Sequence, residues 1–171
     1  QSIVSVVPPM IAEWSWNRFG WSPKIWLRNR NIFTQSQALW SIVGYVIGLG
    51  DRHPDNILID EENSQVVHVD FDCIFSRGMS LQIPELVPFR LTKICVSGMG
   101  ATGVEGLFRN QCESVLKLMR GKKKTLLAVL HAFIADPLID WQGSSEKNGK
   151  PTSSFKKAKD VITAIEKKLN G

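Results

Sequence analysis

The sequence contains little cysteine and no long uninterrupted apolar run. Its three cysteines, Cys73, Cys95 and Cys112, are widely spaced, and none belongs to a C-x-x-C pair. This pattern argues against a disulfide framework and predicts free, packed thiols in a reducing compartment. Because no run of about 18 apolar residues occurs, we expect no membrane span. The first residues lack the positive flank and cleavage site of a signal peptide, so none is expected either.

Large apolar side chains are well supplied. Apolar residues make up 43% of the 171 residues, with six Trp and eight Phe, so about one domain with a sizeable core is expected. Positive charge is concentrated near the C-terminus, where ten Lys stand against five acids after Gly121. Such a tail could contact nucleic acid or an acidic partner, but a solvated helix face is the simpler interpretation. Direct nucleic-acid contact is therefore not predicted.

Apolar periodicity predicts a mostly helical α+β fold. The expected helices cover residues 9–19, 34–47, 104–120, 124–135 and 155–171. Capping boxes are expected to begin the second and third of these helices, at Thr34 and Thr102. Residues 20–31 are interpreted as a connector. Gly48 and Gly50 are expected to end the second helix, because glycine tolerates the left-handed conformation of many helix ends.

Two β-branched runs, residues 57–59 and 66–69, predict one hairpin around a polar turn. An isolated hairpin is marginally stable, so it must pack on helices or extend another sheet. With the turn centred on Asn63, Asn56 would face Asp70 across the two strands. Directly opposed residues have Cβ atoms about 4.5–5.5 Å apart. The hairpin therefore predicts that these two side chains meet at its open end.

Polar side chains are concentrated in the loop before the first strand of this hairpin. Asn56 and Asp70 could share a hard cation, since Mg²⁺ is usually held by one or two carboxylates plus phosphate oxygens. Asp51 could accept a hydrogen bond from a hydroxyl nucleophile. Arg52 and His53 could stabilise developing phosphate charge. A base, two metal ligands and charge stabilisers are the groups that phosphoryl transfer requires.

Each of these side chains also has a structural interpretation, as a turn residue, a cap, an ion-pair partner or a satisfied histidine. For Arg52, an ion pair with Asp55 or Asp70 would be compatible with a role at the site. His68 lies in mid-strand and is interpreted mainly as a core histidine. Asp55 and Asp72 are interpreted as mainly structural.

Residues 98–103 fit the pattern G-x-G-x-x-G, which in dinucleotide-binding proteins joins a strand to a helix. Residues 91–96 could be mistaken for that strand. A dinucleotide site also requires a second strand that ends in an acid about 20 residues further on. No such strand is predicted, so these glycines are interpreted as the structural start of a helix.

The segments "GYVIGLGDRHPDNILID" and "VVHVDFDCIF" resemble the catalytic and metal-binding loops of the phosphatidylinositol-3-kinase-related protein kinases. "PELVPFRLT" resembles the end of their activation segment, and "GMGATGVEGLFR" and "DPLIDW" resemble further blocks of the family. Within the family, "HVDFDCIF" and "KKAKDVITAIEKKL" resemble the ATR branch most, and the ATM branch is the next most similar, through "GVEG" and "DPLIDW".

The resemblance implies the C-terminal lobe of a protein-kinase-like (PI3/PI4-kinase) fold over residues 1–141. Its parts would be a catalytic loop at 50–56, a metal-binding loop at 70–72 and an activation segment at 73–92. A flexible linker, 142–154, and a terminal amphipathic helix, 155–171, would follow. We expect the amino-terminal lobe and the closing FATC segment to lie outside this chain, which alone should lack kinase activity.

By the same resemblance, Asp51 would be the catalytic base and His53 would contact the γ-phosphate. Asn56 and Asp70 would bind Mg²⁺, or Mn²⁺, together with ATP. Arg52 would support the loop. Asp72 stands where ordinary protein kinases have the Gly of Asp-Phe-Gly, which leaves the flexibility of the activation segment open.

The implied activity is serine/threonine protein kinase, acting on Ser/Thr-Gln sites in a nuclear DNA-damage checkpoint, with a regulatory adaptor subunit. A lipid kinase of the same superfamily is one alternative. Inositol phosphate headgroups are bound by several basic residues, whereas Arg77 is the only basic residue among residues 73–88. A non-catalytic pseudokinase scaffold is the other alternative, and the intact Asp51, Asn56 and Asp70 give no sign of it.

Overall fold

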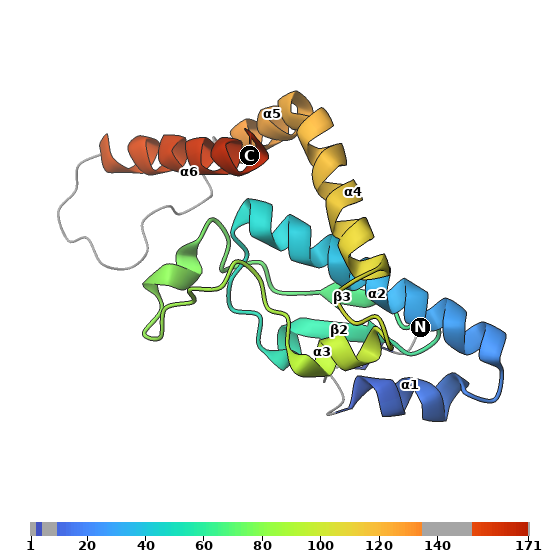
Figure 1. The fold of residues 1–171 in the computed structure, drawn as a ribbon. Helices are drawn as coiled ribbons and strands as arrows, with labels where there is room; N and C mark the ends of the chain where they lie inside the picture. The colour runs from blue at the N-terminus through green and yellow to red at the C-terminus, as the bar shows by residue number, and fades with distance from the viewer. Residues whose placement is uncertain (1–2, 5–9, 135–151, 171) are drawn as a thin grey trace. The chain divides into compact units, whose positions relative to one another are not determined.

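The computed structural model describes residues 3–4, 10–134 and 152–170. The chain divides into two compact units, Gln1–Val115 and Leu116–Gly171. Along the chain, the first unit contains β1 (Ile3–Val4), α1 (Ile11–Phe19), α2 (Pro23–Ile47), the 3₁₀ turn η1 (Pro54–Asn56), β2 (Ile57–Asp60), β3 (Val66–His68), the 3₁₀ turn η2 (Arg77–Ser80) and α3 (Lys93–Gly98). Helix α4 (Leu107–Gly121) crosses the boundary, and α5 (Lys123–Ile134) and α6 (Thr152–Asn170) follow (Figure 1).

The predicted α+β fold, mostly helical with one hairpin, is confirmed. Strands β2 and β3 form the hairpin, and β1 adds a third antiparallel strand on the other edge of β2. The sequence did not predict β1, because a two-residue strand has no periodicity to detect. The extra strand meets the expectation that the hairpin extends another sheet.

Helix α2 is longer than predicted. It begins at Pro23, so the connector predicted over residues 20–31 is wrong. Proline suits the first helical position because that residue needs no hydrogen-bonded N–H, and Trp26 N–H donates to the Ser22 carbonyl at 2.9 Å. Thr34 is not a cap: it lies inside the helix, and its hydroxyl donates to the Arg30 carbonyl at 2.8 Å. The predicted end is confirmed, with Gly48 left-handed at φ 65°.

The register of the hairpin differs from the prediction by one residue. Ile57 pairs with His68, and Val69 N–H donates to the Asn56 carbonyl at 3.1 Å, so Asn56 does not face Asp70. The turn explains the shift: Asp60 N–H donates to the Gln65 carbonyl at 2.9 Å. The buried Asp60 carboxylate also accepts two backbone N–H groups of the turn, from Glu62 at 2.8 Å and Asn63 at 3.2 Å. An aspartate that bonds its own turn in this way fixes the turn centre.

The apolar core of the first unit lies between α2, the hairpin and α3. It consists of Ile11, Phe33, Ala38, Ile57, Ile59, Val66, Cys95, Met99 and Phe108. Burial of each large side chain contributes about 1.5–3 kcal/mol. Two polar bonds fix α2 on β3: Ser36 Oγ accepts the Val66 N–H at 2.9 Å, and Trp40 Nε1 donates to the Val66 carbonyl at 3.0 Å. These bonds fix α2 and β3 relative to each other, and thereby support the loops that follow them.

The glycine-rich segment after α3 has no strand before it, because residues 93–98 form that helix. Helix α4 begins at Leu107, three residues later than predicted. Gly103 and Gly106 have positive φ angles of 51° and 91°, which keep this stretch in turns. Thr102 does not cap α4. A dinucleotide-binding strand is therefore absent at these positions.

The second unit contains the packed helices α5 and α6. Ile162, Ile165 and Leu169 are buried on α6, and Lys123 of α5 bonds Glu166 and Asn170, each at 2.7 Å. Residues 135–151, which include most of the predicted linker, lie outside the described residues. Helix α6 begins three residues earlier than predicted, so residues 152–154 of the predicted linker are helical. The division into a 1–141 lobe, a linker and a terminal helix otherwise stays a prediction. No helix in the described part of the chain has both the length and the apolarity needed to cross a membrane.

Candidate functional site

The loop that follows α2 runs beside the segment that follows β3. Gly48 turns the chain out of the helix in the left-handed conformation. Three backbone hydrogen bonds then join the two segments: Phe75 N–H to the Ile47 carbonyl at 2.9 Å, Ser76 N–H to Gly48 at 2.8 Å and Gly50 N–H to Cys73 at 2.7 Å. Residues far apart in sequence are thereby brought to one end of the hairpin.

The Arg52 side chain joins the same two segments from inside the molecule. It is only 5% exposed. Its guanidinium donates to the carbonyls of Gly50 at 2.8 Å, Val69 at 2.5 Å and Asp70, and lies 3.5 Å from that of Asn56. Arg52 therefore bonds backbone carbonyls and does not form the ion pair considered from sequence. The planar fork of an arginine suits this task, because its donors point in fixed directions.

The charge of Arg52 lies among carboxylates. Burial lowers the pKa of its guanidinium, while the nearby Asp70 and Asp51 carboxylates oppose that shift. An arginine remains protonated at neutral pH in proteins. The site therefore keeps one buried positive charge beneath two exposed aspartates.

Both of these aspartates have a backbone conformation that non-glycine residues rarely adopt. The φ angle is 55° at Asp51 and 58° at Asp70, which places each in the left-handed region. The Asp51 N–H donates to the Glu85 carboxylate at 2.9 Å, and its carbonyl accepts the Asn56 amide at 2.8 Å. The Asp70 carboxylate accepts the Asp72 N–H at 3.1 Å. Such conformations persist where the surroundings enforce them, and they cluster at functional sites.

Asn56 and Asp70 offer oxygen atoms of the kind that Mg²⁺ prefers. The buried Asn56 donates through Nδ2, and among the described residues its carboxamide oxygen accepts no hydrogen bond. Asp70 is exposed, lies two residues beyond the end of β3 and has a left-handed φ, so it does not follow the alternation of the strand. In the described ranges, no group of three or more His, Cys, Asp or Glu side chains could hold a metal ion by itself. This donor set fits a cation that takes its remaining ligands from phosphate oxygens and water.

His53 lies at the surface of the loop. Its Nδ1 is 3.7 Å from the Asp55 carboxylate, and both side chains are well exposed. Of the five residues predicted from sequence, Arg52 and Asn56 are therefore buried within the loop. Asp51, His53 and Asp70 are open to solvent.

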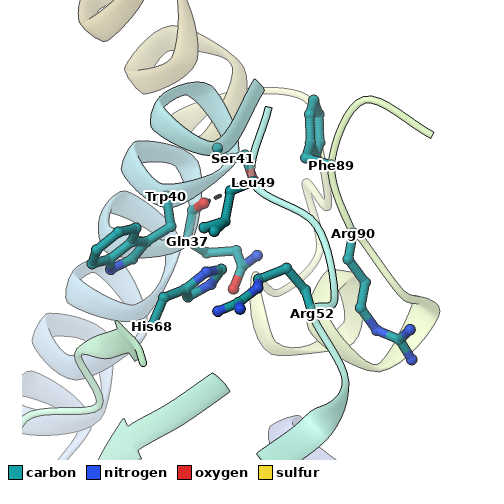
Figure 2. Close-up of a pocket in the computed structure, with 9 residues that line it drawn as sticks. Gln37, Trp40, Ser41, Leu49, Arg52, His68, Phe89 and Arg90 are labelled. Atoms are coloured by element: carbon teal, nitrogen blue, oxygen red, sulfur yellow. Dashed lines mark hydrogen bonds between the residues drawn. The ribbon is translucent and has the colours of Figure 1, made fainter. Parts of the chain in front are cut away.

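The side chains of His68 and Gln37 lie next to the Arg52 guanidinium (Figure 2). His68 is 8% exposed and stacks on Trp40, with ring centroids 4.8 Å apart. Burial lowers the pKa of His68 to about 4, and the Arg52 charge adds to the effect. Both ring nitrogens, and Oε1 of Gln37, have no hydrogen-bond partner among the residues described. These groups line a cavity of about 10 Å³ beside Arg52. The interpretation of His68 as a buried core histidine is confirmed.

Sequence reasoning missed Glu85. The motif "PELVPFRLT" marked this segment, but no role was assigned to its glutamate. The contact between Glu85 and Asp51 spans 34 residues, and no spacing rule connects loop positions that far apart. Only the fold reveals this contact.

Comparison with known proteins identifies the family. Residues 4–143 match the family described as phosphatidylinositol 3- and 4-kinase. The serine/threonine-protein kinase ATR of Arabidopsis thaliana is 41% identical over 169 residues, which are 99% of this chain and 6% of the relative. Protein kinase rad3 of Schizosaccharomyces pombe is 41% identical over 171 residues, 100% of this chain and 7% of the relative. The chain thus spans a small fraction of these proteins.

Solved structures agree with this result. The FAT and kinase domain of CtTel1 superposes with a TM-score of 0.83 at 36% identity, covering 94% of this chain and 11% of that one. The Tel1 kinase butterfly symmetric dimer gives a TM-score of 0.86 at 38% identity, covering 95% of this chain and 7% of that one. The chain belongs to the phosphatidylinositol 3- and 4-kinase family, and within it to the phosphatidylinositol-3-kinase-related protein kinases, with ATR-type kinases among its relatives.

Proposed function

We propose that the protein containing this chain transfers the γ-phosphoryl group of ATP to serine or threonine hydroxyls of protein substrates. In this proposal the chain supplies the catalytic loop, 50–56, and the metal-binding loop, 70–72. The observation that carries the proposal is the Arg52 guanidinium, which bonds carbonyls of both loops at once. A single buried side chain thereby holds the candidate base and the candidate metal ligand in one rigid unit.

Asp51 is the candidate catalytic base. Its peptide groups are held on both sides, by Glu85 and by Asn56, while its carboxylate is exposed. A fixed and accessible carboxylate can accept a hydrogen bond from the substrate hydroxyl and orient the oxygen for attack on phosphorus. In the same proposal the exposed imidazole of His53 donates to the oxygens of the transferred phosphoryl group.

Asn56 and Asp70 are the candidate ligands of Mg²⁺, or of Mn²⁺ in its place. When bound, the ion neutralises charge on the phosphate oxygens. The residues of the chain hold their own positions: the Asn56 amide is bonded to the Asp51 carbonyl, and the Asp70 carbonyl to Arg52. These bonds fix the Asn56 side chain and the Asp70 backbone before ATP arrives.

The names of the relatives support the proposed substrate class. Proteins named serine/threonine-protein kinase ATR and protein kinase rad3 share about two fifths of this sequence. We propose Ser/Thr-Gln sites as substrates, a DNA-damage checkpoint in the nucleus as the setting, and a regulatory adaptor subunit as the partner. A lipid substrate is less favoured, because residues 73–88 contain only one basic residue, Arg77.

The test uses the full-length protein with Mg·ATP and three substrates: a Ser-Gln peptide, the matching Ala-Gln peptide and phosphatidylinositol vesicles. We expect phosphate transfer to the Ser-Gln peptide alone. Transfer to the vesicles alone would establish a lipid kinase, whereas the absence of both ATP binding and transfer would support a pseudokinase.

The residue test replaces Asp51 by Asn. Loss of a general base should lower kcat by about 10²–10⁴-fold. Asp55→Asn is the matched control, since Asp55 is an exposed acid of the same loop. It should stay within about threefold of wild type, because an exposed ion pair contributes little. Equal losses in the two variants would contradict the role of Asp51.

A further inference from the structure

An acidic residue of the activation segment, 73–92, lies against the catalytic loop. The Glu85 carboxylate accepts the backbone N–H of Asp51 at 2.9 Å. The N–H of Glu85 in turn donates to the Gly78 carbonyl at 3.0 Å, so a closed loop of the segment presents the carboxylate. Hydrogen bonds to an ionised acceptor are roughly twice as strong as neutral ones. This contact is therefore a specific link between two loops.

Two glycines make room for the carboxylate. A Cβ atom at either Gly50 or Gly78 would lie 2.5 Å from Glu85 Oε2. Neither glycine has a positive φ angle, so conformational freedom does not account for them. The Glu85 carboxylate is the nearest group to both positions, and at Gly50 a Cβ atom would also lie 3.1 Å from Cys73 Sγ and from Gly78 Cα. Gly50, Gly78 and the Asp51 N–H thus form a cradle that surrounds one oxygen of the Glu85 carboxylate.

The bonded N–H belongs to a residue that needs support. Asp51 has a φ angle of 55°, a conformation that surrounding contacts must enforce. Its peptide groups are held by Asn56 on one side and by Glu85 on the other. Loss of Glu85 would remove one of these two restraints and leave a polar N–H without this partner.

We propose that Glu85 is a positioning residue, which holds Asp51 in its left-handed conformation and makes the catalytic loop depend on the conformation of residues 78–85. This inference rests on the proposed function of Asp51. When residues 78–85 lie as they do here, the acceptor is in place. Movement of that segment withdraws the acceptor and releases Asp51, so any partner that shifts the segment would change kcat.

The first experiment compares three variants of the full-length kinase on the Ser-Gln peptide. Glu85→Ala should lower kcat about 10–100-fold, which corresponds to the loss of a typical hydrogen bond to a charged group. The KM for Mg·ATP should stay within about twofold of the wild-type value. Glu85→Gln keeps an acceptor of the same shape and should recover to within about fivefold of wild type. Glu62→Gln removes an exposed acid and should leave kcat unchanged.

The second experiment uses the cradle itself. Gly78→Ala should reduce kcat as much as Glu85→Ala, because the added Cβ displaces the carboxylate. In the Glu85→Ala background the same change should be neutral within about twofold, since nothing remains to displace. If Gly78→Ala lowers kcat by the same factor in the wild-type and Glu85→Ala backgrounds, the inference is overturned.

Hydrogen exchange separates this inference from the proposed function. The Asp51 amide should exchange at least about tenfold faster in Glu85→Ala than in wild type, while the amides of α2 stay unchanged. Unchanged exchange at Asp51 would overturn the positioning role, whatever the activity. Faster exchange in a protein whose wild type phosphorylates no peptide would uphold the contact and contradict the proposed kinase function instead.

Discussion

The candidate catalytic loop, 50–56, and the helix pair α5–α6 are stabilised in different ways. In the loop, buried polar groups are bound by fixed partners: Arg52 donates to backbone carbonyls, and Asn56 to the Asp51 carbonyl. In the helix pair, α6 buries apolar side chains such as Ile165 and carries an ion pair to Lys123 at its surface. Apolar contacts tolerate small shifts, whereas directional bonds do not. Substitution of the buried, bonded side chains of the loop should therefore affect chemistry, and substitutions in the helix pair should affect stability alone.

The largest effect is expected at Arg52. Arg52→Ala leaves the carbonyls of Gly50, Val69 and Asp70 without this partner, at about 1–3 kcal/mol for each unsatisfied group. We expect kcat for the Ser-Gln peptide to fall by at least about 100-fold, because the summed cost of about 3–9 kcal/mol exceeds the roughly 2.7 kcal/mol that a 100-fold change represents. Arg52→Lys should be nearly as damaging, since an ammonium cannot reproduce the fork.

A matched control is available on α4. Arg109 is well exposed and bonds Glu105 and Glu113. Arg109→Lys should keep kcat within about twofold of wild type, because surface ion pairs contribute about 0–1 kcal/mol. A wild-type kcat in Arg52→Lys would show that a point charge is enough, and the proposed carbonyl clamp would be wrong.

A smaller effect, on stability, is expected at His68. Burial depresses its pKa from 6.5 to about 4 in the folded chain. Between those values the unfolded state binds more protons, so stability is complete above about pH 6.5 and is lost as the pH falls toward 4. At pH 5 the loss is about 2 kcal/mol. Protection of the β3 amides from hydrogen exchange should then weaken about 30-fold relative to pH 7, after correction for intrinsic rates.

His68→Phe provides the control for this pH dependence. A phenyl ring can keep the stacking on Trp40 but cannot take up a proton. The variant should show equal protection of β3 at the two pH values. If wild type and His68→Phe lose protection equally at pH 5, other groups are responsible.

The smallest effect is expected in the second unit. Lys123→Met removes an ion pair whose side chains are 27% and 44% exposed, so α6 should lose about 0.2–1 kcal/mol. Exchange of the α6 amides should become slightly faster, with kcat unchanged. A fall in kcat comparable to that of the Arg52 variants would erase the contrast between the two regions.

Local signals in the sequence were sufficient for several elements. Glycine at position 48 predicts the end of α2, and two β-branched runs predict the hairpin. A loop rich in charged and amide side chains is also a local feature, so its residues could be named from sequence. Whether they act as proposed is decided by experiment.

Other features depended on contacts that no short window contains. The first half of α2 reads as a connector because it is rich in Trp and polar residues, yet tertiary packing buries Asn29 and Phe33 there. The register was shifted by the bonds of the Asp60 carboxylate within its own turn. The contact of Glu85 with Asp51 requires the whole fold.

The most direct test of the account concerns Asp70 in the full-length protein. ATP affinity should be measured with and without Mg²⁺ for wild type, Asp70→Ala and Asp72→Asn, followed by phosphate transfer to the Ser-Gln peptide. We predict that Asp70→Ala loses the Mg²⁺-dependent part of ATP binding and at least about 100-fold in kcat, whereas Asp72→Asn keeps both. Wild-type Mg²⁺ dependence and transfer in Asp70→Ala would contradict the assignment of the site.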